Sequence, residues 1–311
     1  MREFKIDFNK TLGPVLIGYL IILIVATVFS FIFGVNLDIN FKGGTKISYS
    51  YTGEIADDDI HSVVKEKLDK NYTLTKSTSL AGDTQTFEIA LAGKNSISAE
   101  SQEKLTKALA DKFKDNEIAL YNSNSVSPNV AGTFFIKSLV AVAITAILVI
   151  IYVGIRFKKI GGVSAAITAL AALVFDILVT FAVCVIFRLQ IDANYIAVIL
   201  TILGYSLNDT IVIYDRVREN KRLNPSMEIG ELVNLSVNKV MTRNIVTSIT
   251  TVLAVLTIVL VSEIYGLTSL RTFAIPMAFG LVSGAVSSLF VSGPLWVIWK
   301  RYKAKKEAKR R

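Results

Sequence analysis

The sequence predicts a membrane protein: an all-α bundle of six transmembrane helices, with a small α+β domain inserted between the first two helices. The chain of 311 residues is 52% hydrophobic, and its mean hydropathy is positive. This composition is typical of membrane proteins and argues against a soluble enzyme. One long polar segment, residues 34–130, lies between the first two apolar runs and predicts the inserted domain.

Six apolar runs predict six membrane crossings, because each comes near or exceeds the roughly 20 residues that a spanning helix needs. The first run follows Arg2, Lys5 and Lys10 and is longer than a signal-peptide core, so we expect a retained anchor. In the last run, Pro276 is expected to kink the helix. The predicted crossings are residues 12–33, 133–155, 162–187, 194–215, 243–263 and 272–299.

The polar segment predicts a folded domain of alternating strands and helices. Gly43 and Gly44 allow a sharp exit from the membrane before the first strand. A hairpin turn is expected at Ala81, Gly82 and Asp83, and Ser98 is a suitable N-cap for the second helix. The expected elements are a strand at 46–51, a helix at 57–68, strands at 72–79 and 85–91, a helix at 98–113 and a strand at 117–122. The order βαββαβ predicts a ferredoxin-like fold.

Charge predicts the orientation in the membrane. Residues 34–130 contain 11 Lys or Arg and 14 Asp or Glu, a net charge of −3. Because the whole chain has a net charge of +9, the other residues together carry +12. These positive charges cluster at the N-terminus, at 156–159, at 216–222 and in the tail, all on one side of a six-helix bundle. The positive-inside rule makes that side cytoplasmic. We therefore expect both termini in the cytoplasm and an extracytoplasmic domain.

The predicted division of the chain follows from these spans. Residues 1–33 would form the cytoplasmic N-terminus and first helix, and 34–130 the extracytoplasmic α+β domain. Residues 131–299 would form the remaining bundle, and 300–311 a basic cytoplasmic tail.

Several function classes are disfavoured by the residues present. Short basic clusters beside the spans favour contact with anionic lipids over nucleic acid. The chain has one Cys, Cys184, and one His, His61, which leaves no set for nucleophilic or metal chemistry within the membrane. Three acids that open a helix next to His61 favour a helix N-terminus over a metal site. We expect neither enzyme activity nor a cofactor or metal.

Asp209 is the most informative residue, because an ionised carboxylate near the centre of a spanning helix costs about 2.5–3.5 kcal/mol on insertion scales. On a helix, Asp209 stacks against Tyr205 and Ser206. The neighbouring Asn208 shares a face with Thr201, Gly204 and Asp215. The fourth helix thus has a polar flank that favours an ion or proton site, or one half of a buried pair.

The fifth helix offers a partner for Asp209. A small and hydroxylic stripe begins at Arg243 and is expected to face the bundle interior. If the two helices are adjacent, Arg243 is placed to neutralise Asp209, either as a titrating proton-transport pair or as a static salt bridge. The stripe comprises Arg243, Thr247, Thr250, Thr251 and Ala254.

Asp176 is a second intramembrane acid, in the third helix on the face of Ala165, Ala169 and Ala172. That face favours an interior position, as a hydrogen-bonded structural acid or as a relay carboxylate. In the sixth helix, Gly280, Gly284 and Ser288 recur every four residues and indicate tight helix packing. The charges from Asp215 to Asn220 are expected to mark where the fourth helix leaves the bilayer.

Several segments resemble the SecF family, subunits of the bacterial Sec translocase's accessory complex in the resistance-nodulation-division superfamily. The run from Gly204, Tyr205 and Ser206 through Asp215 and Arg216 resembles the family's most specific segment. The second resemblance is Phe41, Gly43, Gly44 and Thr45 after the first helix, and the third is Thr242 to Ser248. Phe175 stands directly before Asp176, at a position where family members often have a histidine. This chain therefore lacks whatever role that histidine has in other members.

The resemblance implies a function and partners. Family members are proton-driven subunits of the plasma membrane that assist protein export after ATP-driven translocation, with SecD, the SecYEG channel and the translocating preprotein as partners. It places the family's proton-transport Asp and Arg on Asp209 and Arg243, while Asn208 and Thr247 are candidates to hydrogen-bond the relay. The coupling ion, H⁺ or Na⁺, stays open. Two alternatives are a half-size resistance-nodulation-division transporter of lipid or drug, and a passive translocase scaffold.

Overall fold

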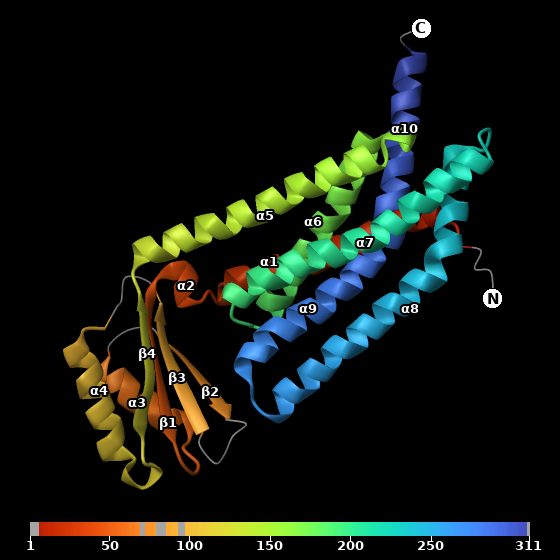
Figure 1. The fold of residues 1–311 in the computed structure, drawn as a ribbon. Helices are drawn as coiled ribbons and strands as arrows, with labels where there is room; N and C mark the ends of the chain where they lie inside the picture. The colour runs from red at the N-terminus through yellow and green to blue at the C-terminus, as the bar shows by residue number, and fades with distance from the viewer. Residues whose placement is uncertain (1–5, 69–71, 79–84, 93–96, 310–311) are drawn as a thin grey trace.

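The protein consists of a long helical bundle with a small sheet at one end (Figure 1). The structure is a computed structural model that describes residues 6–68, 72–78, 85–92 and 97–309. α1 begins and α10 ends at the end of the bundle away from the sheet. The described residues contain six helices long and apolar enough to cross a membrane. An even number of crossings agrees with two chain ends on one side.

Helices account for all six candidate spans. α1 begins at the basic N-terminal end, and a short helix, α2, precedes the sheet. The last span joins α9, a π-helical turn and α10 without a loop. The bounds are α1 Phe8–Phe33, α2 Ile39–Lys42, α5 Pro128–Arg156, α6 Gly162–Ile186, α7 Ala193–Leu223, α8 Ile229–Ile264, α9 Thr268–Ser287, the π-helical turn Ser288–Ser292 and α10 Gly293–Ala308.

Two helices extend well beyond the apolar runs that predict them. α7 continues to Leu223 instead of 215, and α8 begins at Ile229 instead of 243. The added turn of α7 carries ion pairs at helical spacing, Arg218 to Asp215 at 2.8 Å and Arg216 to Glu219 at 2.6 Å. Such i,i+3 pairs support a helix outside the membrane. The charged residues therefore continue the helix, which hydropathy alone does not indicate.

The sixth span contains an irregular segment in addition to the proline. Pro276 lies inside α9, which runs on as an α-helix to Ser287. The departure from α-helical geometry among the described residues of this span is the π-helical turn at Ser288–Ser292. π-helical turns are often found at functional sites, which directs attention to the contacts of this segment.

The sheet has four antiparallel strands in the order β2-β3-β1-β4. Its helices, α3 and α4, cover one face (Figure 1). The elements follow the predicted order, although the expected turn at 81–83 lies outside the described residues. Their bounds are β1 Gly44–Tyr51, α3 Asp57–Lys67, β2 Thr73–Thr78, β3 Gln85–Ala92, α4 Ala99–Lys112 and β4 Ala119–Val126. Short 3₁₀ turns lie at Lys114–Asn116 and Lys158–Ile160.

The sheet unit has a hydrophobic core of its own. Alternating residues of β1 and β3, including Ile47, Tyr49 and Phe87, are fully buried against Leu105 and Leu109 of α4. Ser98 caps α4 as predicted, because its hydroxyl accepts from the Ser101 N–H at 3.2 Å. This core holds the sheet together independently of the bundle.

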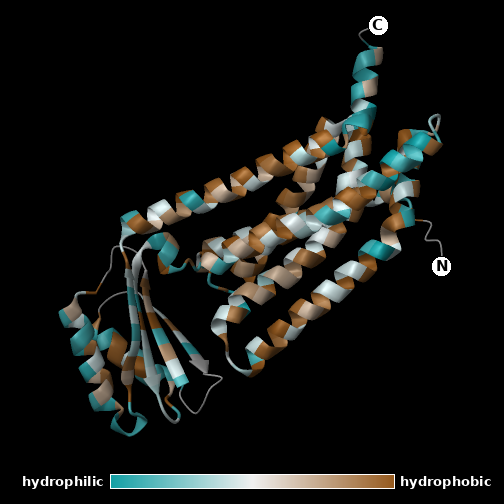
Figure 2. Cartoon of the chain, in the orientation of Figure 1, coloured by the Kyte–Doolittle hydropathy of each residue, from teal (hydrophilic) through white to brown (hydrophobic). Residues whose placement is uncertain are grey.

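The bundle divides into central and peripheral helices. Between 50% and 61% of the apolar window is buried in α6, α7 and the α9–α10 span, against 11% to 17% in α1, α5 and α8. Much of the ribbon of α5 and α8 has the brown of hydrophobic residues in Figure 2. The peripheral helices therefore have the composition of lipid-facing surfaces, and the polar groups concentrate where the central helices meet.

Candidate functional site

Asp176 lies at the centre of the bundle in a cage of serine hydroxyls. Its carboxylate is fully buried on α6. Three hydroxyls donate to it: Ser206 of α7 at 2.7 Å, Ser283 of α9 at 2.7 Å and Ser287 of α9 at 2.9 Å. The predicted interior position is therefore correct, and one side chain joins three helices.

Glycines of α9 permit this close approach. A Cβ at Gly280 would collide with Ile202 of α7 and would come within 2.7 Å of the Thr180 hydroxyl on α6. A Cβ at Gly284 would lie 3.0 Å from the Cβ of Ser206. The glycine stripe thus serves tight helix packing, as predicted, and brings Ser206 within reach of Asp176.

Asp209 is buried as well, but few groups hold it. Its side chain lies on α7 with 3% of the residue exposed. Within the described residues, one side-chain hydroxyl donates to it, that of Ser248 on α8 at 3.4 Å. Nearby, the Tyr205 hydroxyl donates to the Thr247 carbonyl at 3.0 Å and lies 2.7 Å from that of Thr251. α7 and α8 are therefore adjacent at Asp209.

Arg243 does not pair with Asp209 in this structure. Across the described ranges, no carboxylate lies within the 4 Å of an ion pair to Arg243. Arg243 is exposed one helical turn before Thr247, whose hydroxyl donates to the Arg243 carbonyl at 2.9 Å. The salt bridge that the sequence suggested is thus absent from this conformation.

The stripe that begins at Arg243 is largely exposed, contrary to the prediction, although Thr251 is half-buried beside Tyr205. Arg243, Thr247 and Thr250 are exposed, whereas Asn244 and Ser248 are buried against the neighbouring helices. Both sets have helical spacing and small polar side chains, so sequence periodicity did not distinguish them. On α7, Thr201, Gly204 and Asn208 are also exposed.

A column of hydroxyls extends from the Asp176 cage toward the basic end of the bundle, which sequence analysis missed. The Ser288 hydroxyl donates to the Ser206 carbonyl at 3.0 Å and accepts from Thr210 at 3.1 Å. Further along, the Tyr214 hydroxyl donates to the Ser292 carbonyl at 3.4 Å. Ser288 and Ser292 bound the π-helical turn, so this irregular backbone supplies polar groups to the column.

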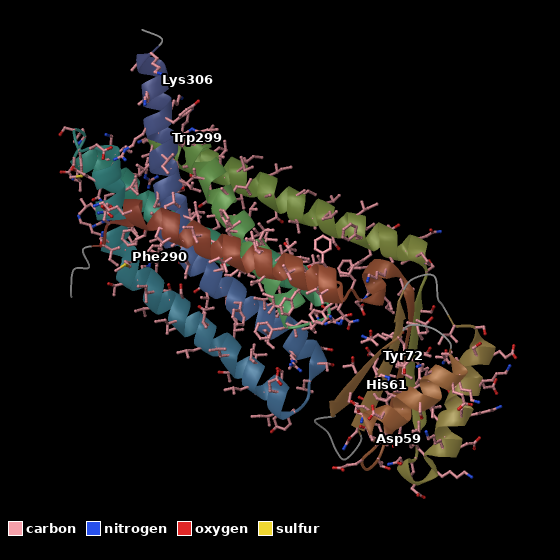
Figure 3. All side chains as sticks on the ribbon, turned by 180° about the vertical axis from the view of Figure 1, so that it is seen from behind. Asp59, His61, Tyr72, Phe290, Trp299 and Lys306 are labelled. Atoms are coloured by element: carbon pink, nitrogen blue, oxygen red, sulfur yellow. The ribbon has the colours of Figure 1, made fainter. Side chains whose placement is uncertain are left out.

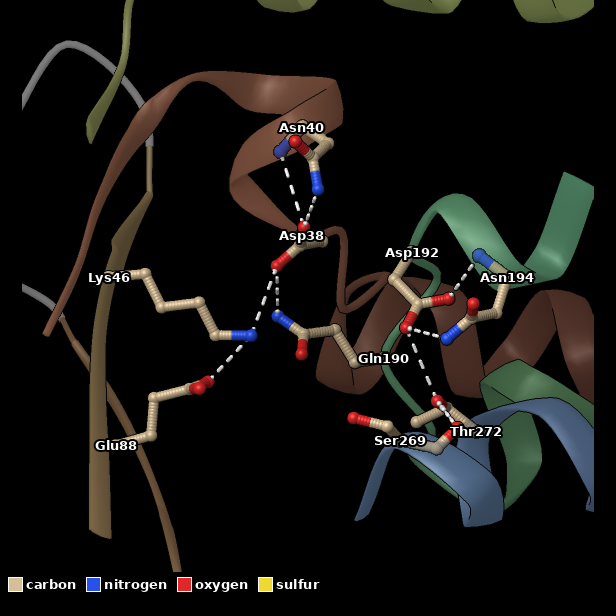
Figure 4. A network of polar contacts seen from close by, with 9 residues as sticks. All are labelled: Asp38, Asn40, Lys46, Glu88, Gln190, Asp192, Asn194, Ser269 and Thr272. Atoms are coloured by element: carbon tan, nitrogen blue, oxygen red, sulfur yellow. Dashed lines mark hydrogen bonds and ion pairs between the residues drawn. The ribbon is translucent and has the colours of Figure 1, made fainter. Parts of the chain in front are cut away.

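A second polar cluster joins the sheet to the bundle (Figure 4). Asp38, which caps α2, is 3% exposed and accepts from Gln190 at 3.1 Å, and its carboxylate lies 3.8 Å from the Lys46 ammonium. Lys46 pairs with Glu88 at 2.8 Å. Burial lowers the pKa of Lys46, but the bond and charge of Glu88, with Asp38 and Asp192, outweigh burial and raise it.

The same cluster reaches the start of α7. Asp192 caps that helix by accepting from Asn194 N–H at 2.9 Å and Tyr195 N–H at 3.3 Å, and Thr272 of α9 donates to it at 3.3 Å (Figure 4). A parallel bridge between Leu37 and Ile191 lies beside it. The segment that leads from α1 to the sheet is thus bonded to Gln190 and Ile191, just before the helix that carries Asp209.

The segment after α1 that resembles the SecF family, from Phe41 to Thr45, positions the sheet unit. Phe41 packs edge-on against Phe134 of α5, with ring centroids 5.3 Å apart. Gly43 has φ +76°, and a Cβ there would lie 3.0 Å from Pro128, the first residue of α5. Thr45 is buried and lies 3.2 Å from the Ser125 hydroxyl. These residues fix a turn in the backbone.

His61 is engaged within the sheet unit. Its Nδ1 lies 2.7 Å from the Tyr72 hydroxyl, and both side chains lie far from the labelled Trp299 and Lys306 of α10 (Figure 3). Within the described ranges, no group of three His, Cys, Asp or Glu residues could hold a metal ion.

Six helices that could span a membrane, buried carboxylates and a small four-stranded sheet define a multi-pass membrane protein. The family described as "Protein export membrane protein SecD/SecF, C-terminal" matches residues 104–302. The chain belongs to this SecD/SecF family.

Similar proteins agree with that assignment. Protein translocase subunit SecF of Sebaldella termitidis is 34% identical over 274 residues, covering 87% of this chain and 84% of that protein. Protein translocase subunit SecDF of Bacillus subtilis is 35% identical, and the match covers 89% of this chain but only 36% of that longer protein. The chain thus corresponds to nearly a whole SecF and to part of a SecDF.

A solved structure shares the architecture. The crystal structure of SecDF, a translocon-associated membrane protein from Thermus thermophilus, is 27% identical with a TM-score of 0.79. The match covers 96% of this chain and 39% of that chain. The protein is therefore a membrane protein of the protein-translocation class.

Proposed function

We propose that this chain is a SecF-like subunit that uses the proton gradient to assist protein export across the bacterial plasma membrane. It would act after ATP-driven translocation, with SecD as its partner and the SecYEG channel and preprotein nearby. Asp209 would accept and release the proton. The observation that carries this proposal is a buried mid-span carboxylate held by a single hydroxyl at 3.4 Å.

The sparse bonding of Asp209 favours a change of protonation over a static role. An intramembrane carboxylate needs a partner to stay ionised at low cost. Arg243 is exposed on the adjacent helix near Asp209, with no carboxylate paired to it in the described chain. We propose that Arg243 responds to the charge of Asp209, that Asn208 and Thr247 hydrogen-bond the relay, and that Asp176 takes part through Ser206.

The exposed polar face of α7 and α8 supports a SecD partner. Thr201, Gly204 and Asn208 on α7 continue into Arg243 and Thr247 on α8. Polar side chains seldom face lipid, and small residues allow helices to approach closely. A Cβ at Gly204 would meet nothing within 4 Å in this chain. A SecD helix would cover this face and complete a relay around Asp209.

We propose the following placement in the membrane. Both termini and the basic tail, residues 300–311, would lie in the cytoplasm with 1–33 as first span and 131–299 as bundle. Residues 34–130 would form an extracytoplasmic ferredoxin-like domain, which the antiparallel order β2-β3-β1-β4 supports. This domain would position or move the emerging preprotein, and its bonds to Gln190 and Ile191 connect it to the segment that leads into the helix of Asp209.

Replacing Asp209 by Asn tests the proposal in vesicles that contain the chain, its partner and the translocon. We expect normal assembly and loss of the preprotein release that a proton gradient stimulates, because Asn cannot bind and release a proton. Release is measured under separately imposed H⁺ and Na⁺ gradients, which identifies the coupling ion. Glu100→Gln is the matched control, since it removes an exposed carboxylate from α4.

Other outcomes separate the alternatives. Release at the wild-type rate from Asp209→Asn vesicles under a proton gradient would favour a passive scaffold. Unchanged preprotein release with altered efflux of lipid or drug would indicate a half-size transporter. If Asp209→Asn fails to assemble, Asp209→Glu retains a carboxylate and should restore gradient-dependent release.

A further inference from the structure

A cleft of about 1430 Å³ opens at the end of the bundle that lies away from the sheet. Its floor is α7 from Val212 to Arg222. One wall is the end of α5 with the following 3₁₀ turn, and the other is α8 around Lys239 and Arg243. Segments far apart in the sequence thus enclose one cavity at a membrane boundary.

The cleft carries a large positive charge. Nine Lys or Arg side chains and two acids line it, a formal net charge of +7. Both acids are already engaged: Asp215 pairs with Arg156 at 3.2 Å and Arg218 at 2.8 Å, and Glu219 with Arg216 at 2.6 Å. The other cations have no ion pair within the described chain: Lys158, Lys159, Lys221, Arg222, Lys239 and Arg243.

One buried donor in the cleft also lacks an acceptor. Within the part of the chain that the structure describes, Arg216 Nε is buried and has no hydrogen-bond partner. A buried donor left unpaired costs about 1–3 kcal/mol in general, so native proteins seldom retain one. Unpaired cations and an unpaired donor in one cavity indicate an anionic ligand with several acceptor oxygens.

The apolar part of the lining favours a lipid over a free anion. Ile155, Val212 and Val240 lie beside the cations, and exposed apolar side chains continue from Ile155 along α5. Examples are Leu148 and Ile151 on α5. A soluble phosphate would use the cations alone, whereas a phospholipid would use both surfaces.

We propose that this cleft binds the headgroup of an anionic phospholipid. The phosphate oxygens would accept from the unpaired Lys and Arg side chains other than Arg243, and the acyl chains would follow α5. The site goes beyond the proposed export function and needs no proton transfer at Asp209. A lipid bound in this cleft would lie in the cytoplasmic leaflet, against the cytoplasmic end of α7.

The test uses the full chain with its partner subunit, titrated with cardiolipin or phosphatidylcholine, and counts bound lipid by native mass spectrometry. A cleft variant replaces Lys158, Lys159, Arg222 and Lys239 by Gln and spares Arg243. We expect cardiolipin binding to fall about tenfold or more, because each basic residue at a lipid surface contributes to attraction. The matched control replaces Lys303, Lys305, Lys306 and Lys309 in α10 and its end, an equal loss of charge, and should bind like the wild type.

Four results would overturn the proposal. Equal loss in both variants would indicate general surface attraction, and no loss in the cleft variant would exclude the cleft. Full displacement of cardiolipin by excess inorganic phosphate would indicate a free-anion site. Binding to the chain alone, but not with its partner, would assign the cleft to an acidic segment of the partner. Thermal unfolding of the cleft variant, compared with the control, separates lost binding from lost folding.

Discussion

Asp176 and Asp209 are both buried carboxylates of one bundle, yet their surroundings differ. Asp176 accepts from three serines on two other helices, whereas Asp209 accepts from one serine at a longer distance. A carboxylate that accepts three hydrogen bonds is held in one position by the helices that supply the donors. One that is buried but lightly bonded can change its state with less rearrangement. Bonding, and not burial, distinguishes the two acids.

Removal of Asp176 should have the largest effect on stability. Asp176→Ala leaves a cavity and three serine hydroxyls without their acceptor, so we expect a loss of about 2–4 kcal/mol in unfolding free energy. Asp209→Ala removes only one long bond and should cost clearly less. Unfolding by SDS titration in mixed micelles measures both. Equal losses would abolish the distinction between the two sites.

Gly280→Ala should have the next largest effect. The added methyl collides with Ile202 and approaches the Thr180 hydroxyl, and overpacking of this kind costs about 1–3 kcal/mol. The separation of α7 from α9 should also weaken the Ser206 bond to Asp176. Gly132→Ala on α5 is the control, because its Cβ would meet nothing within 4 Å. A stable Gly280→Ala variant in the same SDS titration would show that the cage tolerates displacement of α7.

Ser206→Ala should have a smaller effect, about 1 kcal/mol, because two serines still bond Asp176. Ser248→Ala is the matched comparison at Asp209 and should change stability by less than about 0.5 kcal/mol, since intramembrane hydrogen bonds average about 0.6 kcal/mol and this one is long. The same titration ranks the two. A larger loss for Ser248→Ala would contradict the contrast between the acids.

The Asp209→Asn export assay sharpens the comparison when Asp176→Asn is measured beside it. Asn at position 176 can still accept from serines through its carbonyl oxygen, so part of the cage is retained. We expect Asp176→Asn to retain more gradient-dependent preprotein release than Asp209→Asn. The opposite ranking would make Asp176 the principal acid.

The spans and strands were predictable because their signals are local. Apolar length identifies a membrane helix, alternation identifies a strand, and Ser98 marks a helix start through its own hydroxyl. The serine cage was not predictable, because Ser283 and Ser287 meet Asp176 only after three helices take their relative rotations. The outward direction of Arg243 was missed for the same reason: two adjacent polar stripes on α8 satisfy one helical period.

The sheet unit leaves and rejoins the bundle at one point. Gly44 at its start pairs with Val126 at its end, and Gly43 contacts Pro128 at the beginning of α5. An insertion whose two ends already touch adds or removes chain length without stretching the helices on either side. The sheet unit can therefore differ in size between relatives while α1 and α5 keep their positions.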